Sequence, residues 1–162
     1  GTATFAGSVK IGGTAAANEI DEYEEGQFHP VAEDESGNAQ SYYEQNGQYN
    51  RGYYTKIGNI VHFTIHFYTS SAGSTVGSEN VKITGLPFTS GSGGAGISGS
   101  FHIPHMSGMA SGDSCFATGF IFSGQSELWP QTVDSNGNNT FMTITEWSAP
   151  RGSITGWYST SQ

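Results

Sequence analysis

The chain has 162 residues and a mass of 17.1 kDa, enough for one domain with a short appendage. Only 5 residues are Lys or Arg against 14 Asp or Glu, which excludes a nucleic-acid binder because so few cations cannot neutralise a phosphate track. No apolar run approaches the roughly 18 residues of a membrane-spanning helix, so we expect no membrane insertion. The single cysteine, Cys115, excludes an internal disulfide framework. The 10 Phe, 8 Tyr and 3 Trp residues favour a packed core over disorder.

The first 19 residues differ from the rest of the chain because they are small and almost uncharged. Within them, Phe5 to Ile11 alternates apolar and polar side chains, which predicts one short strand. Such a strand cannot bury its own apolar face, so it needs neighbours from the same chain or from other copies of it. We interpret residues 1–19 as the end of a repetitive stalk and residues 20–162 as the main domain. The acidic residues 19–25 are predicted to form a solvated junction between the two.

From Phe28 onward the sequence predicts short strands separated by turn signals. The clearest is Ile60 to Tyr68, whose alternation predicts a core face and a polar face that carries His62 and His66. Turn dipeptides occur at Asn46-Gly47, Gly58-Asn59 and Asn136-Gly137. The other predicted strands are Tyr49 to Ile57, Val81 to Thr84, Ile97 to Ile103, Cys115 to Phe122, Leu128 to Val133, Phe141 to Trp147 and Ser153 to Thr160.

Strands at fairly regular spacing, without any segment of helical periodicity, predict an all-β fold. The expected architecture is an antiparallel, jelly-roll-like β-sandwich with a short N-terminal stalk strand. A barrel fits the same spacing, and a trimeric interdigitated β structure is the best alternative because many of the strands are marginal alone. The segment Gly85-Leu86-Pro87-Phe88 predicts a strand end at which Leu86 and Phe88 turn back into the core.

Three motifs occur in an order that resembles a known family. They are Asn18 to Gly26 followed by Phe28-His29-Pro30, then Gly52 to Val61, and then Ile83 to Ser90. Together they resemble the C-terminal tip domain of bacteriophage tail-fibre and tail-spike proteins, of the type common among phages of aquatic bacteria. The resemblance extends from about Val9 to the end of the chain. Gln27-Phe28-His29 departs from the family's pattern, which more often has a small residue, Trp and Thr before the proline, and residues 101–130 match least.

The resemblance implies a homotrimer at the distal end of a tail fibre in the virion, continuing from fibre residues that precede Gly1. It implies recognition of the host cell surface, through a polysaccharide or an outer-membrane receptor, with no enzymatic activity and no cofactor. Avidity would follow from three weak sites on one rigid fibre. Two alternatives stay open: a depolymerase that cleaves the surface glycan, and a purely structural virion part such as a head-fibre module. A glycosidase needs two carboxylates across a sugar site, and the sequence singles out no such pair.

An acidic cluster supplies the candidate metal ligands. Ca²⁺ prefers several carboxylate oxygens, and a cation would also relieve the repulsion between three copies of the cluster near a trimer axis. The cluster lacks the spacing of a known calcium loop, and a solvated junction is the alternative. His62 and His66 lie about 13 Å apart along their strand, too far to share one metal ion. The candidate Ca²⁺ ligands are Asp21, Glu22, Glu24 and Glu25.

Host recognition is predicted within residues 101–130. Residues 104–114 contain Pro, Gly and Met without clear alternation, which predicts a loop, and functional residues concentrate on loops. Trp129 precedes Pro130, which suits a sheet edge or a loop mouth, and its ring would offer a sugar a stacking surface. Contact between subunits is the alternative for these side chains. The candidate receptor-binding residues are His105, Met106, Met109 and Trp129.

Overall fold

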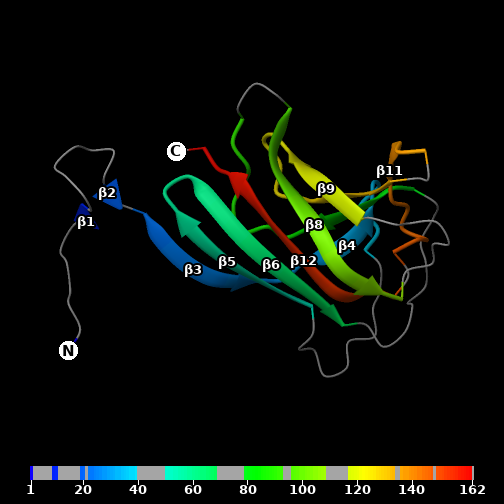
Figure 1. Cartoon of the computed structure of the whole chain (residues 1–162), viewed down its shortest axis with the longest axis horizontal. Coiled ribbons are helices and arrows are strands. Elements are labelled where there is room, and N and C mark those ends of the chain that lie inside the picture. The colour runs from blue at the N-terminus through cyan, green and yellow to red at the C-terminus, as the bar shows by residue number, and fades with distance from the viewer. Residues whose placement is uncertain are drawn as a thin grey trace.

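One antiparallel eight-stranded sheet dominates the fold (Figure 1). Every regular element that the structure describes is a β-strand, so the prediction of an all-β fold is confirmed. The described part of the chain holds no helix of the length and apolar character that crossing a membrane requires. This computed structural model describes residues 1, 9–10, 19–20, 22–39, 50–68, 79–92, 96–108, 117–133, 136–147 and 149–161.

The strand order in the large sheet is β11-β10-β9-β8-β12-β6-β5-β3, and all neighbours run antiparallel. Strands adjacent in the chain mostly pair as hairpins, but the last strand, β12, inserts between β6 and β8 and joins the two halves of the sheet. The strands are β3 (Tyr23–Phe28), β5 (Arg51–Ile57), β6 (Ile60–Tyr68), β8 (Ile97–Ser107), β9 (Ala117–Phe122), β10 (Trp129–Val133), β11 (Asn139–Phe141) and β12 (Arg151–Ser159).

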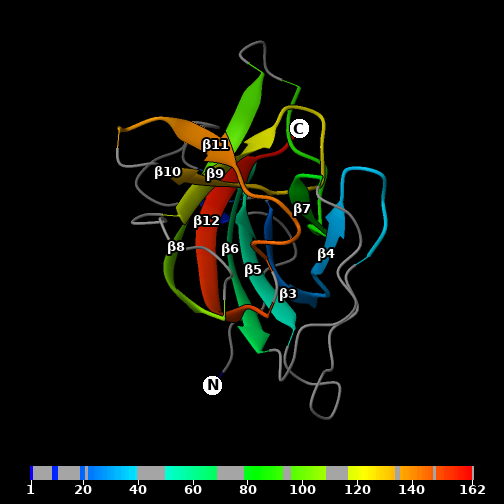
Figure 2. The same cartoon turned by 90° about the vertical axis from the view of Figure 1, so that its right-hand side faces the viewer.

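A smaller layer covers one face of this sheet (Figure 2). It consists of β4 (Val31–Asp34) paired with β7 (Val81–Thr84). The Val81 N–H donates to the Met142 carbonyl at 2.8 Å, and Ile83 forms a bridge with Leu128, so the second layer is tied to the chain around β10 and β11. The result is a sandwich with unequal layers, eight strands against two, rather than the even division of a regular jelly roll.

The hydrophobic core lies between these two layers. On β6 the predicted alternation is confirmed, because Val61, Phe63, Ile65 and Phe67 are buried and the histidines between them are exposed. The Phe67 and Trp147 rings meet edge to face at 5.5 Å between centroids. The core cluster consists of Ala32, Val61, Phe63, Ile65, Phe67, Val81, Ile83, Leu86, Phe101, Ile121, Leu128, Met142, Ile144, Trp147, Ile154 and Tyr158.

Glycines on the core face of the sheet make room for aromatic rings of neighbouring strands. A Cβ atom at Gly119 would lie 2.2 Å from Phe101 Cζ, and one at Gly52 would lie 2.2 Å from Phe28 Cζ. At Gly156 a Cβ would lie 2.6 Å from the Cβ of Phe101. Real Cβ contacts are not this short, so the high glycine content of the sheet has a packing cause.

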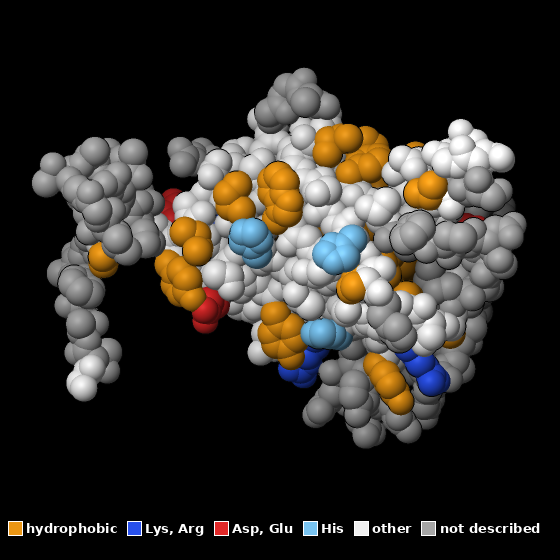
Figure 3. Space-filling view, in the orientation of Figure 1, with side chains coloured by type: hydrophobic (Ala, Val, Ile, Leu, Met, Phe, Trp, Pro, Cys, Tyr) orange, Lys and Arg blue, Asp and Glu red, His pale blue; other side chains and the backbone are white. Residues whose placement is uncertain are grey.

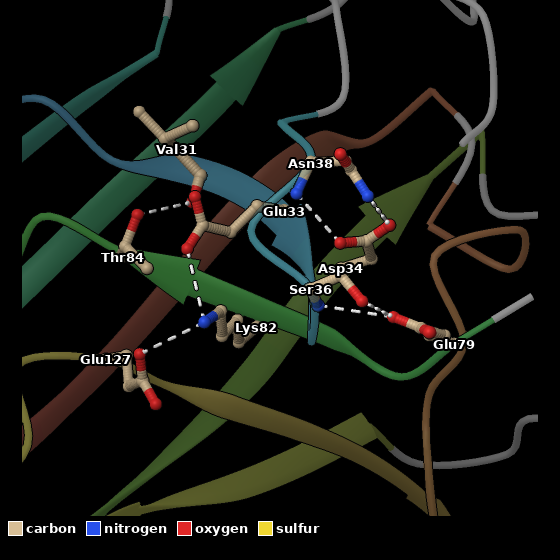
Figure 4. Close-up of polar contacts among 9 residues, drawn as sticks. All are labelled: Val31, Glu33, Asp34, Ser36, Asn38, Glu79, Lys82, Thr84 and Glu127. Atoms are coloured by element: carbon tan, nitrogen blue, oxygen red, sulfur yellow. Dashed lines mark hydrogen bonds and ion pairs between the residues drawn. The ribbon is translucent and has the colours of Figure 1, made fainter. Parts of the chain in front are cut away.

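Polar contacts hold the second layer and gather acidic side chains there (Figure 4). Lys82 on β7 lies between Glu33 on β4, at 3.3 Å, and Glu127, at 3.7 Å. The Ser36 hydroxyl donates a hydrogen bond of 2.8 Å to the Glu79 carboxylate, which joins the turn after β4 to the start of β7. Much of the protein's negative charge therefore lies on the layer opposite the open side of the large sheet.

The turn that follows β4 is closed by a buried carboxylate. Asp34 is 2% exposed and accepts hydrogen bonds from the Asn38 backbone N–H at 2.8 Å and from the Asn38 side-chain amide at 2.9 Å. These hydrogen bonds, led by the side-chain amide, hold the pKa of Asp34 below its usual value, with burial acting in the opposite direction. Gly37 adopts φ +84° within this turn. The carboxylate form of Asp34 is thus part of the folded structure.

The sequence predicted that the acidic segment 19–25 forms a junction, but the structure places part of this segment in the large sheet. Tyr23–Phe28 forms β3, the edge strand of the large sheet. It pairs with β5 in a register in which Tyr23 lies opposite Ile57 and Phe28 lies opposite Gly52. This strand was not predicted because an edge strand tolerates charged side chains on both faces, so its sequence carries no clear hydrophobic alternation. β4 was missed for the same kind of reason, since its four residues include two acids.

The loop predicted from residue 104 is also corrected, because β8 continues to Ser107. The register of β8 on β12 shifts between Ser153 and Thr155, which pair with His105 and His102 and leave one extra residue on β8. This bulge falls where Pro104 interrupts the strand, and β9 pairs with β8 only as far as His102. A proline, which has no N–H to donate, is tolerated at such a bulge.

One further predicted strand ends earlier in the structure, and another can be compared only in part. β11 stops at Phe141, and residues 144–146 form a turn, which the Glu146 carboxylate closes by accepting from the Thr143 N–H at 2.7 Å and from its hydroxyl at 3.0 Å. At the N-terminus, β1 (Val9–Lys10) pairs with β2 (Glu19–Ile20), so the neighbour it needs comes from the same chain. Residues 5–8, Asn46-Gly47 and Cys115 lie outside the described residues.

The predicted turns and the predicted strand end that can be compared are confirmed. Gly58 has φ +57° in the two-residue connection of β5 to β6, and Gly137 has φ +81° between β10 and β11. Beyond the end of β7, Leu86 is 7% exposed and Phe88 packs against the core, as the Leu-Pro-Phe pattern predicted.

Candidate functional site

The face of the large sheet that points away from the core is the candidate functional site, here called the open face (Figure 3). Antiparallel sheets usually direct polar side chains to such a face. Here hydrophobic and histidine side chains are spread over it (Figure 3). All the large hydrophobic side chains that are exposed in the described part of the chain belong to it: Tyr23, Tyr53, Ile57, Tyr68, Ile97 and Trp157.

Strand pairing arranges these side chains in rows across the sheet. Because alternate residues of each strand point to the same face, residues paired across strands share one row. The first row runs through Thr55, His62, Trp157 and Ser100, on β5, β6, β12 and β8. The second row runs through Tyr53, Thr64, Thr155 and His102. The third row begins with Arg51, His66 and Ser153.

Two adjoining shallow hollows follow these rows. One has a volume of about 380 Å³ and the other about 230 Å³, and both are lined by His62 and Thr155. We call the two together the trough. Its other outward-facing lining residues are Ser100, His102, Thr118 and Trp157 in the first hollow, and Tyr53, Thr55 and Thr64 in the second.

The trough combines two kinds of chemistry. Trp157 is 46% exposed and Tyr53 is 43% exposed, so both present ring surface to solvent. Threonine and serine hydroxyls and imidazole nitrogens between them donate and accept hydrogen bonds. No carboxylate lines either hollow among the described residues. This set suits a ligand with many hydroxyl groups and apolar ring faces, and it contains no pair of carboxylates for acid–base cleavage of a glycosidic bond.

The candidate Ca²⁺ ligands are separated by the alternation of β3. Glu24 accepts a hydrogen bond from the Tyr54 hydroxyl, and both side chains lie on the core face of the large sheet. Glu25 accepts from the Tyr23 hydroxyl on the open face. Each of these hydrogen bonds to a carboxylate raises the pKa of its tyrosine, with desolvation adding to the effect.

Glu22 forms an ion pair with Lys56, whose ammonium group lies 5.7 Å from the centre of the Phe88 ring. Asp21 lies outside the described residues. Within the described part of the chain, no group of three His, Cys, Asp or Glu side chains could hold a metal ion. His62 and His66 do share one face, as the sequence predicted.

The predicted receptor-binding residues that the structure describes lie on two strands, His105 and Met106 on β8 and Trp129 on β10. Met106 pairs with Gly152 and packs against the core, so it does not face outward with the trough. His105 pairs with Ser153 through its backbone, and Met109 lies outside the described residues. The predicted loop therefore does not include residues 104–107, which belong to a strand, and the receptor-binding role of the four residues stays a prediction.

Trp129 lies in a strand rather than at a loop mouth. It is the first residue of β10, which is flanked by β9 and β11. Its ring meets Phe122 at 5.8 Å and Phe141 at 5.7 Å, and Phe120 joins the same cluster at 5.9 Å from Phe141. Its indole N–H is buried, and no described group accepts a hydrogen bond from it. The ring is thus largely used in packing, although it lies on the same side of the sheet as the trough.

Comparison with protein-family models, with curated proteins and with solved structures found no match to this chain.

The sequence interpretation missed Tyr53, Thr155 and Trp157 as site residues. A signal was present in β12, where Ser153, Thr155 and Trp157 alternate with the buried Ile154 and Tyr158. An exposed tryptophan on the polar side of such an alternation is a candidate contact residue where other hydrophobic side chains lie near it on the same face.

Proposed function

We propose that this chain is the receptor-binding tip of a phage tail fibre and that it binds a polysaccharide of the host cell surface without cleaving it. The observation that carries the binding role is the trough, where exposed rings alternate with hydroxyl and imidazole groups on a rigid sheet. The three sequence motifs that resemble tail-fibre tips support the virion setting.

In this proposal the rings of Trp157 and Tyr53 stack on the apolar faces of sugar rings. These side chains have few rotatable bonds, so they lose little entropy when a ligand covers them. His62 and Thr155, which lie between them, exchange hydrogen bonds with sugar hydroxyls. A shallow site of this kind binds weakly, and strong attachment comes from several copies acting together.

The test is direct binding of the purified chain to a panel of bacterial surface polysaccharides, with release of reducing ends measured in the same samples. Trp157→Ala and Tyr53→Ala should each weaken binding on the order of tenfold or more, as expected for central aromatic contacts. Tyr23→Ala is the matched control, because Tyr23 is 59% exposed on the same face but lies outside the trough. Unchanged binding by both trough variants would refute the proposal, and release of reducing ends would favour a depolymerase.

The trimeric state is tested separately by light scattering. The proposal expects a mass of about three times 17.1 kDa at micromolar concentration. The trough variants should keep this mass while losing polysaccharide binding. If Trp157→Ala instead dissociated the assembly, the open face would be a contact between subunits and not a ligand site.

A further inference from the structure

The charges of this acidic protein are unevenly divided between its two sides. The formal net charge is −9, yet strand alternation places only one described carboxylate side chain on the open face, that of Glu25 at the β3 edge. The other acids whose side chains are described are engaged elsewhere. Glu22 and Glu24 lie on the core side of β3, Glu146 accepts from Thr143 in the turn after β11, and the remaining ones lie around the second layer: Glu33, Asp34, Glu35, Glu79 and Glu127.

The basic side chains divide by residue type, with two lysines away from the open face and both arginines on it. Lys56 and Lys82 form ion pairs away from the open face. The only two arginines, Arg51 and Arg151, both point to the open face, because Arg51 pairs with His66 and Arg151 pairs with Tyr68. Among the described residues, the open face therefore carries two arginines and one carboxylate, on a protein that is strongly negative.

The two arginines flank one end of the trough. They lie on β5 and β12, on either side of β6, and are offset by two residues along it, so their Cα atoms are roughly 12 Å apart. Arg151 lies over the Tyr68 ring at 5.2 Å, and Arg51 donates a hydrogen bond of 3.2 Å to Gln27. Basic side chains lie beside hydrophobic and histidine side chains at the lower rim of this face (Figure 3).

Arg51 and His66 also adjoin the ring surface of the trough. The rings of Tyr53 and His66 are 6.2 Å apart and meet edge to face. A ligand stacked on Tyr53 would thus place a substituent next to Arg51 and, beyond β6, next to Ser153 and Arg151. A guanidinium group has five donors in a fixed fork, so Arg51 keeps donors for a ligand beyond its hydrogen bond to Gln27.

We propose that the open face binds an acidic polysaccharide, with sugar rings in the trough and sugar carboxylates at Arg51 and Arg151. This deepens the proposed function and rests on it, because it assigns the ligand of the same face. The charge complementarity carries the assignment: carboxylates are the ligand groups that a guanidinium fork recognises, and among the described residues of this face Glu25 alone carries one.

The overall negative charge does not oppose this binding at physiological salt. Stacked layers of a sandwich lie about 10 Å apart, and the Debye length is about 8 Å at 0.15 M ionic strength. The acids around β4 and β7 are therefore screened from a ligand on the open face. Their position also orients the protein, since a negatively charged cell surface repels that side and attracts the arginines.

The experiment compares two probes with one backbone, polygalacturonate and its fully methyl-esterified form, by calorimetry or affinity electrophoresis. The unmodified chain should bind the acid form on the order of tenfold more tightly than the ester at low salt, and the difference should shrink as salt is added. Arg51→Gln with Arg151→Gln should remove the preference. Arg51→Lys with Arg151→Lys keeps the positive charge, so this variant should keep most of the preference for the acid form.

Lys56→Gln with Lys82→Gln is the charge-matched control, because it removes two positive charges from the other side of the molecule. Its fold is checked by circular dichroism, and it should keep the preference for the acid form. The inference is overturned if the chain binds both forms of the polysaccharide equally or binds neither. It is also overturned if the Lys56→Gln, Lys82→Gln control loses the preference for the acid form as fully as the Arg51→Gln, Arg151→Gln variant does. The proposed function is judged separately: it stands if Trp157→Ala or Tyr53→Ala weakens binding to any polysaccharide of the panel, and it fails if neither variant changes binding.

Discussion

Replacing Ile65 by Ala should destabilise the protein by about 2–5 kcal/mol, whereas His66→Ala should cost at most about 1 kcal/mol. Ile65 is fully buried on the core face of β6, and the change removes three carbon atoms at about 0.8 kcal/mol each before the cavity cost is added. His66 is exposed on the opposite face, and the change mainly removes its edge contact with the Tyr53 ring. The two residues are adjacent in the chain, so the pair tests which face of the strand is the core.

Urea unfolding followed by circular dichroism measures both effects. With a denaturant slope near 2 kcal/mol per molar, a loss of 3 kcal/mol lowers the midpoint by about 1.5 M, while His66→Ala shifts it by less than about 0.5 M. Each curve is recorded at two protein concentrations, because an oligomer contact at His66 would make the midpoint depend on concentration. A larger loss for His66→Ala than for Ile65→Ala, independent of concentration, would refute the assigned register of the sheet.

Three further outcomes follow from the packing and the hydrogen bonds. Gly156→Ala should cost at least about 1–3 kcal/mol in the same urea assay, because its Cβ would lie 2.6 Å from the Cβ of Phe101, and a neutral result would mean that the strands separate to admit it. The pKa of Asp34 is lowered in the fold, so the contribution of its carboxylate to stability is present above about pH 4 and is lost as the pH falls through the folded-state pKa. The difference in urea midpoint between the unmodified chain and Asn38→Ala should therefore narrow below about pH 3. A difference that stays constant with pH would contradict the role of the Asn38 hydrogen bonds. Burial raises the pKa of the Tyr158 hydroxyl far above its usual value of about 10, so stability should fall as the pH rises above about 10. Tyr158→Phe should lose less stability over this range than the unmodified chain, which thermal melts at about pH 8 and about pH 11 would measure.

Local patterns were sufficient to predict elements whose stability depends on their own alternation. Ile60–Tyr68 and Val81–Thr84 were predicted with the bounds that the structure has, because their buried residues alternate with polar ones. The glycine turn at Gly58 was predicted because a two-residue hairpin connection needs positive φ. By contrast, Tyr23–Phe28 was missed, since its place at the sheet edge lets it carry charged side chains without cost.

The candidate site could not be predicted in the same way, because it is a property of strand order. Tyr53, His62, His102 and Trp157 come from four strands spread over more than a hundred residues, and they become neighbours only because β12 inserts between β6 and β8. Single-strand alternation indicates which side chains share a face, but it contains no information on which strands pair.

The sequence by itself determined the all-β class, the core face of the central strand and the excess of acidic residues. Only the tertiary structure decided where that charge lies, since carboxylates such as Glu33 and Glu127 gather around Lys82 on the second layer. It also decided that both arginines face the open side of the large sheet. The physical reason is that short-range alternation is written into consecutive residues, whereas the pairing of distant strands is set by the packing of the whole core.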